Sequence, residues 1–393
     1  MTKNDKILWA IWAILALLGA IGLVERLILG HRLAGYSSYV PWGMWVSAYI
    51  FFIGLSAGAF LLSSLVYVFG VHKLERMAKL ALFVAATTLV MSLVTIWFDL
   101  GHMWRSYEVI TRPQFHSMMA WMIWLYSAYF ALLLAELYYA LRRDVRELSP
   151  GEIQEDDRKL KRLATIGIPL AIAFHGGVGA LFGTVSARPF WHSPIYPIMF
   201  LVGALLSGGA LMTFIVSQFW PEKDAAWEDL LQFLGKIVLG FLLFDLLLEW
   251  AEFSIPLWYG VGPEAGLVKF VLFGPFWYVY WVIHILLGVA IPAYLLTKKR
   301  DPKSIGLASA LVAVTFFAIR LNLVIPGLVT PELKGLEHAY IDPIGNHLSY
   351  HYLPSFFEWQ ILMGVVALGI AIFHLGRRYL PLVPNSASHE VSK

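Results

Sequence analysis

The chain has 393 residues, of which 59% are hydrophobic and 14% charged, and its formal net charge is +3. A soluble domain carries about 25% charged residues, so this composition, with a mean hydropathy of +0.69, excludes an ordinary soluble protein and indicates a multi-pass membrane protein. The sequence contains no cysteine, which excludes an iron–sulfur cluster, a covalently attached c-type haem or a disulfide built by this chain.

Ten apolar runs are long enough to cross the ~30 Å hydrocarbon core of a bilayer. We predict spans at Ile7–Val24, Met44–Val71, Ala78–Phe98, Met118–Leu141, Leu163–Ser186, Ile195–Trp220, Leu230–Ala251, Gly274–Leu296, Ile305–Val324 and Phe356–Leu375. The first run is too long for a signal-peptide core, so we expect it to be retained. An even number of spans puts both termini on one side of the membrane.

The basic residues indicate which side that is. They concentrate in the loops on the side of the termini, above all between Arg142 and Arg162, which we interpret as a short inside loop. Because inside loops of membrane proteins are enriched in Lys and Arg, we expect both termini in the cytoplasm and the protein in the cytoplasmic (inner) membrane.

A short internal repeat indicates how the spans are grouped. GLSAGAF at Gly54–Phe60 resembles LLSGGAL at Leu205–Leu211, and such small residues let membrane helices approach closely. The repeat predicts an all-α integral membrane fold with two four-helix bundles, spans 2–5 and 6–9, and with spans 1 and 10 peripheral. The corresponding division is an N-terminal span (1–38), a first bundle (39–190), a second bundle (191–330), and an outer loop, last span and tail (331–393).

Ionisable residues cluster at the outer end of the third span. Asp99, His102 and Arg105 are spaced to share one face if the helix continues, although Gly101 is a potential helix end. One interpretation is a solvated salt bridge at a helix end. The other is a proton-exchanging group at a quinone, because quinol oxidation releases protons.

Two histidines lie at comparable depth inside spans. His175 in the fifth span and His284 in the eighth are each consistent with a hydrogen bond to a neighbouring helix. As a pair they are also consistent with the ligands of a b-type haem, which makes a cytochrome subunit an alternative function.

Four acidic residues lie within the spans. A charge at mid-membrane costs roughly 2.5–3.5 kcal/mol on insertion scales, so such groups usually have a partner or a role. Asp245, Glu249 and Glu252 form one stripe, which indicates either a structural polar seam or a proton path, and Glu136 lies near the inner border, where it can snorkel. A proton-translocating transporter module is therefore a second alternative. No spacing matches a metal site, and no basic surface suits nucleic acid, so we expect neither partner.

Longer motifs resemble the NrfD/PsrC family of quinone-interacting membrane subunits, also called polysulfide reductase NrfD-like. The motifs are YVPWG at Tyr39–Gly43, GLSAGAFLLSSLVYVFG at Gly54–Gly70, FDLGHMWR at Phe98–Arg105, HSMMAWMIWLY at His116–Tyr126, HGGVGALFG at His175–Gly183 and ARPFWHSP at Ala187–Pro194. Ten spans suit the longer branch of the family. LPSFFEWQILMGV at Leu353–Val365 most resembles its DsrP-type members, which serve complexes linked to sulfite reduction.

This resemblance implies a function. Members of the family are membrane-anchor subunits of respiratory oxidoreductase complexes, and they bind menaquinone or another quinone without a haem or iron–sulfur cluster of their own. They exchange electrons with an extracytoplasmic, ferredoxin-like iron–sulfur subunit, which connects them to further catalytic or cytochrome subunits. Protons are released or taken up near the outer face.

The resemblance also assigns roles to residues. It places Asp99 and His102, with Arg105 beside them, at the proton exchange of the quinone. Many relatives carry Arg where this chain has His102, and His exchanges a proton near neutral pH whereas Arg does not. The predicted quinone pocket comprises Trp42, Ser117, Trp121, His175 and Arg188.

Overall fold

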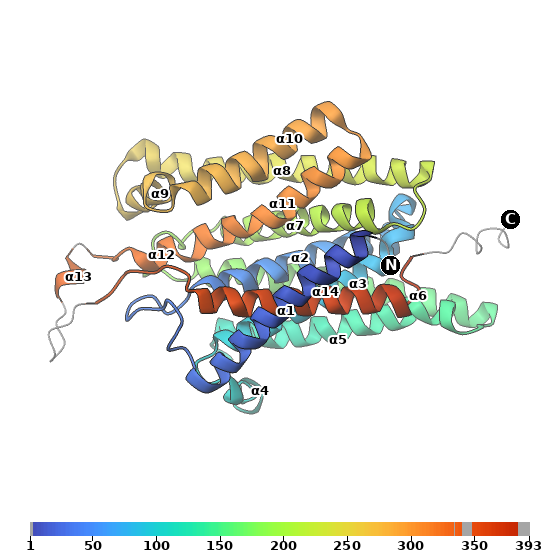
Figure 1. The fold of residues 1–393 in the computed structure, drawn as a ribbon, viewed down its shortest axis with the longest axis horizontal. Coiled ribbons are helices and arrows are strands. Elements are labelled where there is room, and N and C mark those ends of the chain that lie inside the picture. The colour runs from blue at the N-terminus through green and yellow to red at the C-terminus, as the bar shows by residue number, and fades with distance from the viewer. Residues whose placement is uncertain (1–2, 334, 340–347, 384–393) are drawn as a thin grey trace.

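The structure, a computed structural model, describes residues 3–333, 335–339 and 348–383. Its secondary structure over these residues is helical, with no strand among them. The long helices run roughly side by side along one axis (Figure 1). Ten of them are long and apolar enough to cross a membrane. The predicted all-α fold with about ten spans is therefore confirmed.

The spans follow the predicted order. They are α1 (Lys3–Leu29), α2 (Met44–Tyr67), η1 (His72–Met77) with α3 (Ala78–Asp99), α5 (Met118–Val145), α6 (Pro150–Gly183), α7 (Tyr196–Phe219), α8 (Ala225–Tyr259), η3 (Val279–Ala290) with α10 (Ile291–Tyr294) and η4 (Leu295–Lys299), α11 (Pro302–Val324) with α12 (Pro326–Val329), and α14 (Phe356–Tyr379). Short helices lie between them at η2 (Met103–Arg105), α4 (Glu108–Thr111), α9 (Pro263–Phe273) and α13 (Leu336–Ala339).

The polar segment after the fourth span is mostly helix, not the short loop that the sequence indicated. α6 begins at Pro150, because Ser149 and Glu152 form a capping box: the Ser149 hydroxyl accepts from the backbone N–H of Glu152, whose carboxylate accepts from that of Ser149. Hydropathy marks only the part of a helix that lies in lipid, so it misses an extension of this kind.

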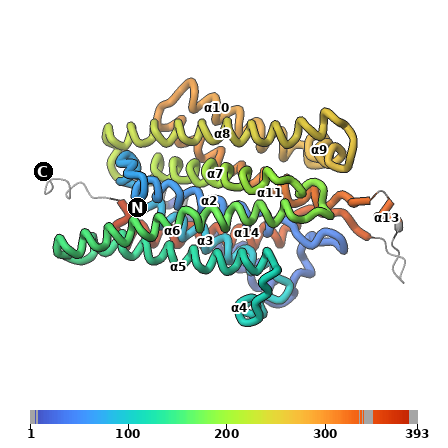
Figure 2. The backbone as a smooth tube through the Cα atoms, turned by 180° about the vertical axis from the view of Figure 1, so that it is seen from behind, coloured from blue at the N-terminus to red at the C-terminus, as the bar shows by residue number. Residues whose placement is uncertain are grey.

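Most of the long helices contact more than one other long helix, and α6 contacts α7 as well as α2 and α5. α2 packs on α3 and α6. α5 also packs on α3 and α6, and Figure 2 shows α5 and α6 side by side. α7 packs on α8 and α11, and the π-helical segment η3 packs on α11. α2 also packs on α7, while α1 packs on α14, which in turn contacts α3.

Two glycines of the repeat bring α2 and α7 into backbone contact. A Cβ atom on Gly58 would lie 2.9 Å from the Cα atom of Gly208, and one on Gly208 would lie 2.6 Å from that of Gly58. No side chain fits in such a gap, so the small-residue motifs hold the middle of the molecule together.

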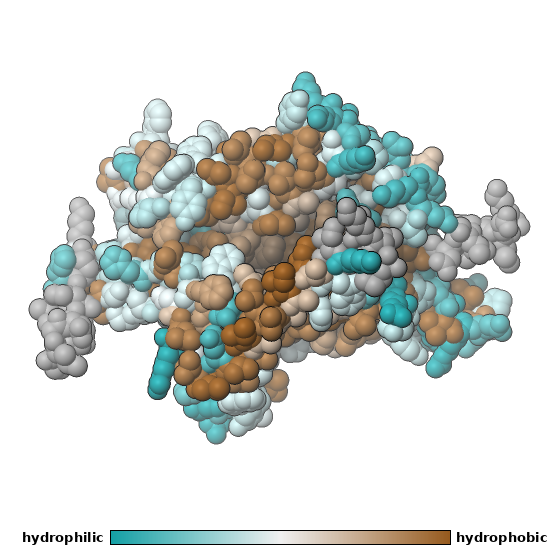
Figure 3. Space-filling view, viewed as in Figure 1, coloured by the Kyte–Doolittle hydropathy of each residue, from teal (hydrophilic) through white to brown (hydrophobic). Residues whose placement is uncertain are grey.

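The two ends of the molecule differ. We call the end where α3 stops the Asp99 end; α4, α9, α12 and α13 lie toward it, at the left of Figure 1. The opposite end, toward the right, carries the start of α1 and the end of α14 and is called the termini end. Figure 3 shows hydrophobic residues gathered across the middle of the molecule, with many hydrophilic residues toward the termini end, as expected for a chain that crosses a membrane.

Candidate functional site

A half-buried carboxylate stands where α3 stops. The helix ends at Asp99, because Leu100 is extended (φ −64°, ψ 129°) and Gly101 follows. The hydroxyl of Tyr36, from the loop after α1, donates a hydrogen bond to Oδ1 of Asp99. Burial, reinforced by the neighbouring Asp99 charge, raises the pKa of Tyr36 well above its usual value, so this hydroxyl keeps its proton and remains a donor.

The two other residues predicted beside Asp99 lie apart from this contact. His102 is exposed. Arg105 is also exposed and forms an ion pair with Glu108, with 2.8 Å between Nε and Oε1. The predicted i, i+3, i+6 face is absent because the helix does not continue past Asp99.

Four of the five predicted quinone-pocket residues divide into two groups, and His175 lies apart from both. Trp42 stacks on Trp191, with 5.9 Å between ring centroids and 21° between the planes. Arg188 donates to the carbonyl of Gly327 at 3.0 Å and pairs with Glu332 at 3.0 Å. These residues lie at the Asp99 end, around the loop between α6 and α7.

The second group lies at the start of α5. Ser117 is the N-cap of that helix, and its hydroxyl accepts from the backbone N–H of Ala120. Trp121 is 44% exposed and donates to the carbonyl of Phe115 at 2.8 Å. The side chains of Ser117 and Trp121 are thus engaged locally.

His175 is completely buried in α6. Its Nε2 lies 2.8 Å from the carbonyl oxygen of Phe200 on α7. A carbonyl only accepts, so Nε2 carries the proton, and in the neutral ring Nδ1 is then an acceptor. This Nδ1 has no hydrogen-bond partner within the described ranges, so α6 carries a buried, unused acceptor.

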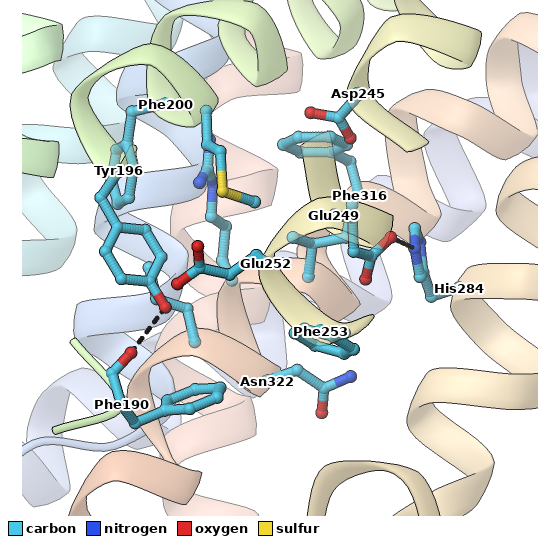
Figure 4. Close-up of a pocket in the computed structure, with 14 residues that line it drawn as sticks. Phe190, Tyr196, Phe200, Asp245, Glu249, Glu252, Phe253, His284, Phe316 and Asn322 are labelled. Atoms are coloured by element: carbon cyan, nitrogen blue, oxygen red, sulfur yellow. Dashed lines mark hydrogen bonds and ion pairs between the residues drawn. The ribbon is translucent and has the colours of Figure 1, made fainter. Parts of the chain in front are cut away.

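A cavity lies among α7, α8, η3 and α11 (Figure 4). The three acidic residues of the predicted stripe line it, and so do Arg320 and Asn322. The other lining residues are mainly aromatic and aliphatic: Phe190, Tyr196, Met199, Phe200, Phe253, Phe316, Ile319, Leu323 and His284. The stripe on α8 therefore faces a cavity between helices.

Charged side chains in this cavity are only partly paired. Glu249 and His284 point toward each other in Figure 4 and form a buried ion pair, with 2.7 Å between Oε2 and Nε2. Arg320 lies over the ring of Phe200, with 4.3 Å from Cζ to the ring centroid. Its Nε and Nη2 have no hydrogen-bond partner within the part of the chain that is described. Glu252 accepts from the hydroxyl of Ser193 at 3.1 Å.

A haem held by His175 and His284 would have to use the Nδ1 atom of each ring. A histidine binds iron through the lone pair of a ring nitrogen. The Nε2 atoms of both His175 and His284 are instead engaged with protein oxygens. The two rings also bond to different helices, α7 and α8 respectively.

Glu136 does not snorkel, contrary to the expectation from its place in the sequence. Its exposed fraction is 0%, and neither carboxylate oxygen has a hydrogen-bond partner among the described residues. It lies on α5, apart from the α8 stripe, so the four acidic residues do not form one continuous row.

Besides Tyr36, three residues near Asp99 escaped the sequence analysis: Arg26, Tyr352 and Glu358. Arg26 on α1 donates to the carbonyls of Phe98 and Leu100. Glu358, completely buried in α14, accepts from the hydroxyl of Tyr352 at 2.5 Å. The one available signal was Ser355-x-x-Glu358, the pattern of a capping box, which the structure contains.

These observations define a multi-pass, all-helical membrane protein with ionisable groups at one end and around a cavity between helices. The family model described as Polysulphide reductase, NrfD matches residues 33–332, and the chain belongs to this family.

Three relatives illustrate the likeness. A selenate reductase subunit of Mesobacillus selenatarsenatis is 35% identical, over 96% of this chain and 94% of its own. The Hdr-like menaquinol oxidoreductase integral membrane subunit of Archaeoglobus fulgidus is 30% identical, over 93% and 91%. The menaquinone reductase integral membrane subunit of Nitratidesulfovibrio vulgaris is 23% identical, over 91% and 87%.

Proposed function

We propose that this chain is the quinone-binding membrane subunit of a respiratory oxidoreductase complex in the cytoplasmic membrane. It exchanges electrons between menaquinol or menaquinone and a ferredoxin-like iron–sulfur partner docked at the Asp99 end. The names of two relatives, a menaquinol oxidoreductase subunit and a menaquinone reductase subunit, support the quinone. The positive-inside pattern supports an outer location for the Asp99 end and a cytoplasmic location for both termini.

The observation that carries the proposal is the Asp99 carboxylate at the membrane boundary. It is half-buried, and Tyr36 donates to one of its oxygens. A bound quinol supplies electrons and protons when it is oxidised, and a positioned carboxylate is a suitable group to receive a proton and pass it to water. His102 is exposed just beyond, where it can relay that proton to solvent.

The buried histidine on α6 also fits a quinol. The unpaired Nδ1 of His175 is an acceptor, and a quinol hydroxyl is a donor. We expect this ring to hold the headgroup, with Trp42 and Arg188 nearer the boundary. The polar atoms of Ser117 and Trp121 are engaged locally, so these two residues are less suited to bind the quinone headgroup.

The first test is purification of the chain from its native membrane, with identification of the proteins, quinone and pigments that accompany it. We expect cysteine-rich iron–sulfur subunits and menaquinone. A chain that purifies without any partner, and that moves protons in liposomes by itself, would contradict the proposal and favour the transporter alternative.

The second test is Asp99→Asn in the intact complex. The amide keeps the size of the side chain and still accepts from Tyr36, but it cannot take up a proton. We expect quinol oxidation to fall by roughly 10²-fold or more, the range found for loss of a general base. Arg112→Gln, an exposed change at the same end, serves as the control. An unchanged rate in Asp99→Asn would exclude the proton role.

A second role, redox-linked proton translocation, is favoured by the cavity beside α8. Asp245, Glu249 and Glu252 face it, and Arg320 covers the same Phe200 whose carbonyl is bonded to His175. This contact joins the candidate quinone site to the candidate proton path.

This role has its own test, Asp245→Asn in complexes reconstituted into liposomes. We expect quinol oxidation to continue while proton translocation per electron falls. Equal proton translocation in the variant and the unaltered complex would remove Asp245 from the path. Glu136 stands apart and without a partner among the described residues, and its part in such a path stays a prediction.

A further inference from the structure

Two helices outside the family match reach the Asp99 end. The match covers residues 33–332, whereas α1 ends at Leu29 and α14 begins at Phe356. The two helices pack closely: a Cβ atom on Gly19 would lie 2.7 Å from the backbone nitrogen of Gly364. α14 also contacts α3, the helix that carries Asp99.

From α1, Arg26 holds the end of α3. Its Nε donates to the carbonyl of Phe98 at 2.8 Å, and its Nη2 donates to that of Leu100 at 2.6 Å. These carbonyls flank Asp99 at a helix C-terminus, where the last carbonyls have no partner in the helix and a cation is favourable. The buried guanidinium therefore fixes the backbone on both sides of Asp99.

From α14, Glu358 anchors the ring next to Tyr36. Its Oε2 accepts from the backbone N–H groups of Gly35 and Ser355, each at 2.9 Å. Its Oε1 accepts from the hydroxyl of Tyr352, which in turn accepts from the backbone N–H of Met44 at 2.6 Å. Each of these polar groups is used, so the position of Tyr352 is closely determined.

The anchored ring continues to Asp99 through one more residue. The ring of Tyr352 stacks on that of Tyr36, with 6.2 Å between centroids and 28° between planes. Tyr36 then donates to Asp99. Tyr36 directly follows Gly35 in the chain, and the backbone N–H of Gly35 donates to the carboxylate of Glu358. The same carboxylate therefore fixes both the loop that carries Tyr36 and the ring of Tyr352.

We infer that Arg26, Tyr352 and Glu358 are positioning residues that hold Asp99 and its donor Tyr36 in place for proton exchange. Arg26 comes from α1, Glu358 from α14 and Tyr352 from the loop before α14, all outside the family match. This inference rests on the proposed function, because it assigns the residues to the proton step at Asp99. The charged and titratable groups that surround Asp99 are Arg26 and His31 from the α1 end, Tyr36 and Tyr352 from loops, and Glu358 from α14.

The test compares tyrosine-to-phenylalanine changes in the intact complex. Tyr352→Phe keeps the stacked ring but removes the bonds to Glu358 and Met44. We expect the kcat of quinol oxidation to fall about tenfold with an almost unchanged KM, because small misplacements of a reacting group slow the chemical step. Tyr129→Phe is the matched control, since it removes a buried tyrosine hydroxyl on α5, 3.3 Å from the carbonyl of Ser56, and should retain the full rate.

A second readout separates positioning from general loss of structure. Tyr36→Phe removes the direct donor to Asp99, a hydrogen bond that favours the charged carboxylate. The acidic limb of the pH–rate profile should then move up by roughly one pH unit. Tyr129→Phe should leave the profile in place. Arg26→Lys keeps the charge but loses the fork that spans two carbonyls, and we expect its kcat to fall as in Tyr352→Phe.

The outcomes are distinct. If Tyr36→Phe, Tyr352→Phe and Arg26→Lys keep the rate and pH profile of the unaltered complex while Asp99→Asn is inactive, the positioning role is wrong and the proposed function stands. If Asp99→Asn is itself fully active, the proposed function fails and the positioning role fails with it. Slower kcat in the positioning variants, with a displaced profile in Tyr36→Phe, supports both.

Discussion

The Asp99 end and the cavity beside α8 bury charge in opposite ways. At the Asp99 end, Glu358 accepts from four groups and Arg26 donates to two carbonyls. In the cavity, Glu249 and His284 pair, but Arg320 has nitrogens without a hydrogen-bond partner among the described residues. A buried polar group is costly unless it is hydrogen-bonded. A cluster is saturated here when its buried polar groups all have hydrogen-bond partners, and such a cluster holds its side chains in fixed positions. An unsaturated cluster instead favours the entry of water or a group that can take up or release a proton.

The difference indicates a division of labour. Saturated groups suit the placing of a proton acceptor, since each bond restricts the position of its neighbour. Unsaturated groups around a cavity suit proton movement, since water can enter and rearrange there.

The largest effect is expected from breaking the ion pair of the cavity. His284→Leu leaves the Glu249 carboxylate buried without its partner and should destabilise the protein by about 3–5 kcal/mol. The double variant Glu249→Leu/His284→Leu should recover most of that loss, because two apolar side chains replace the pair. The thermal inactivation midpoint of the purified complex measures both. Equal midpoints for the single and double variants would contradict a buried, charged pair.

A smaller effect is expected from removing one cation at the Asp99 end. Arg26→Met leaves the carbonyls of Phe98 and Leu100 without their donor and should cost about 1–3 kcal/mol. Arg32→Met, an exposed change nearby, is the matched control and should stay within about 0.5 kcal/mol of the unaltered protein. The same thermal assay applies. If both variants behave alike, the cluster is not saturated in the way described.

The smallest effect is a pH dependence at His31. Burial, and then the charge of Arg26, lowers the pKa of His31 below its usual 6.5, and its Nε2 accepts from Arg26 at 3.2 Å. The unfolded chain therefore takes up a proton first as pH falls through 6.5, so stability is retained above that pH and declines below it.

The measurement is the thermal midpoint of the complex at several pH values. The loss attributable to His31 should not exceed about 1.4 kcal/mol per pH unit. His31→Gln should flatten this part of the profile, while His116→Gln, an exposed change at the same end, should not. A profile that His31→Gln leaves as steep as before would show that the ring is not held neutral.

Much of the fold could be predicted, because lipid imposes it. The apolar runs gave all ten spans, and the start of α2 at Met44 and of α14 at Phe356 agreed to the residue. The beginning of α6 at Pro150 could not be found from hydropathy, since its first turns are polar and a capping box, rather than lipid, starts them. The grouping of spans into two bundles and the division into domains stay predictions.

The candidate site was harder to predict from the sequence, because its contacts join residues far apart in the chain. Asp99 was identifiable as a carboxylate at a helix end, but its donor Tyr36 is 63 residues earlier. Periodicity on one helix grouped Asp99 with His102 and Arg105, which α3 does not reach. The sequence does not reveal the second contact of Glu358. A capping-box glutamate usually bonds only within its own helix end, whereas here Glu358 also accepts from the backbone N–H of Gly35.

The pairing of α1 with α14 has a consequence for biosynthesis. α1 leaves the ribosome long before α14, which follows the other nine spans in the chain. Arg26 can meet the end of α3 early, but Glu358 and its hold on the loop of Gly35 come only with α14. If Asp99 exchanges protons as proposed, that activity is therefore expected to require the insertion of this last helix.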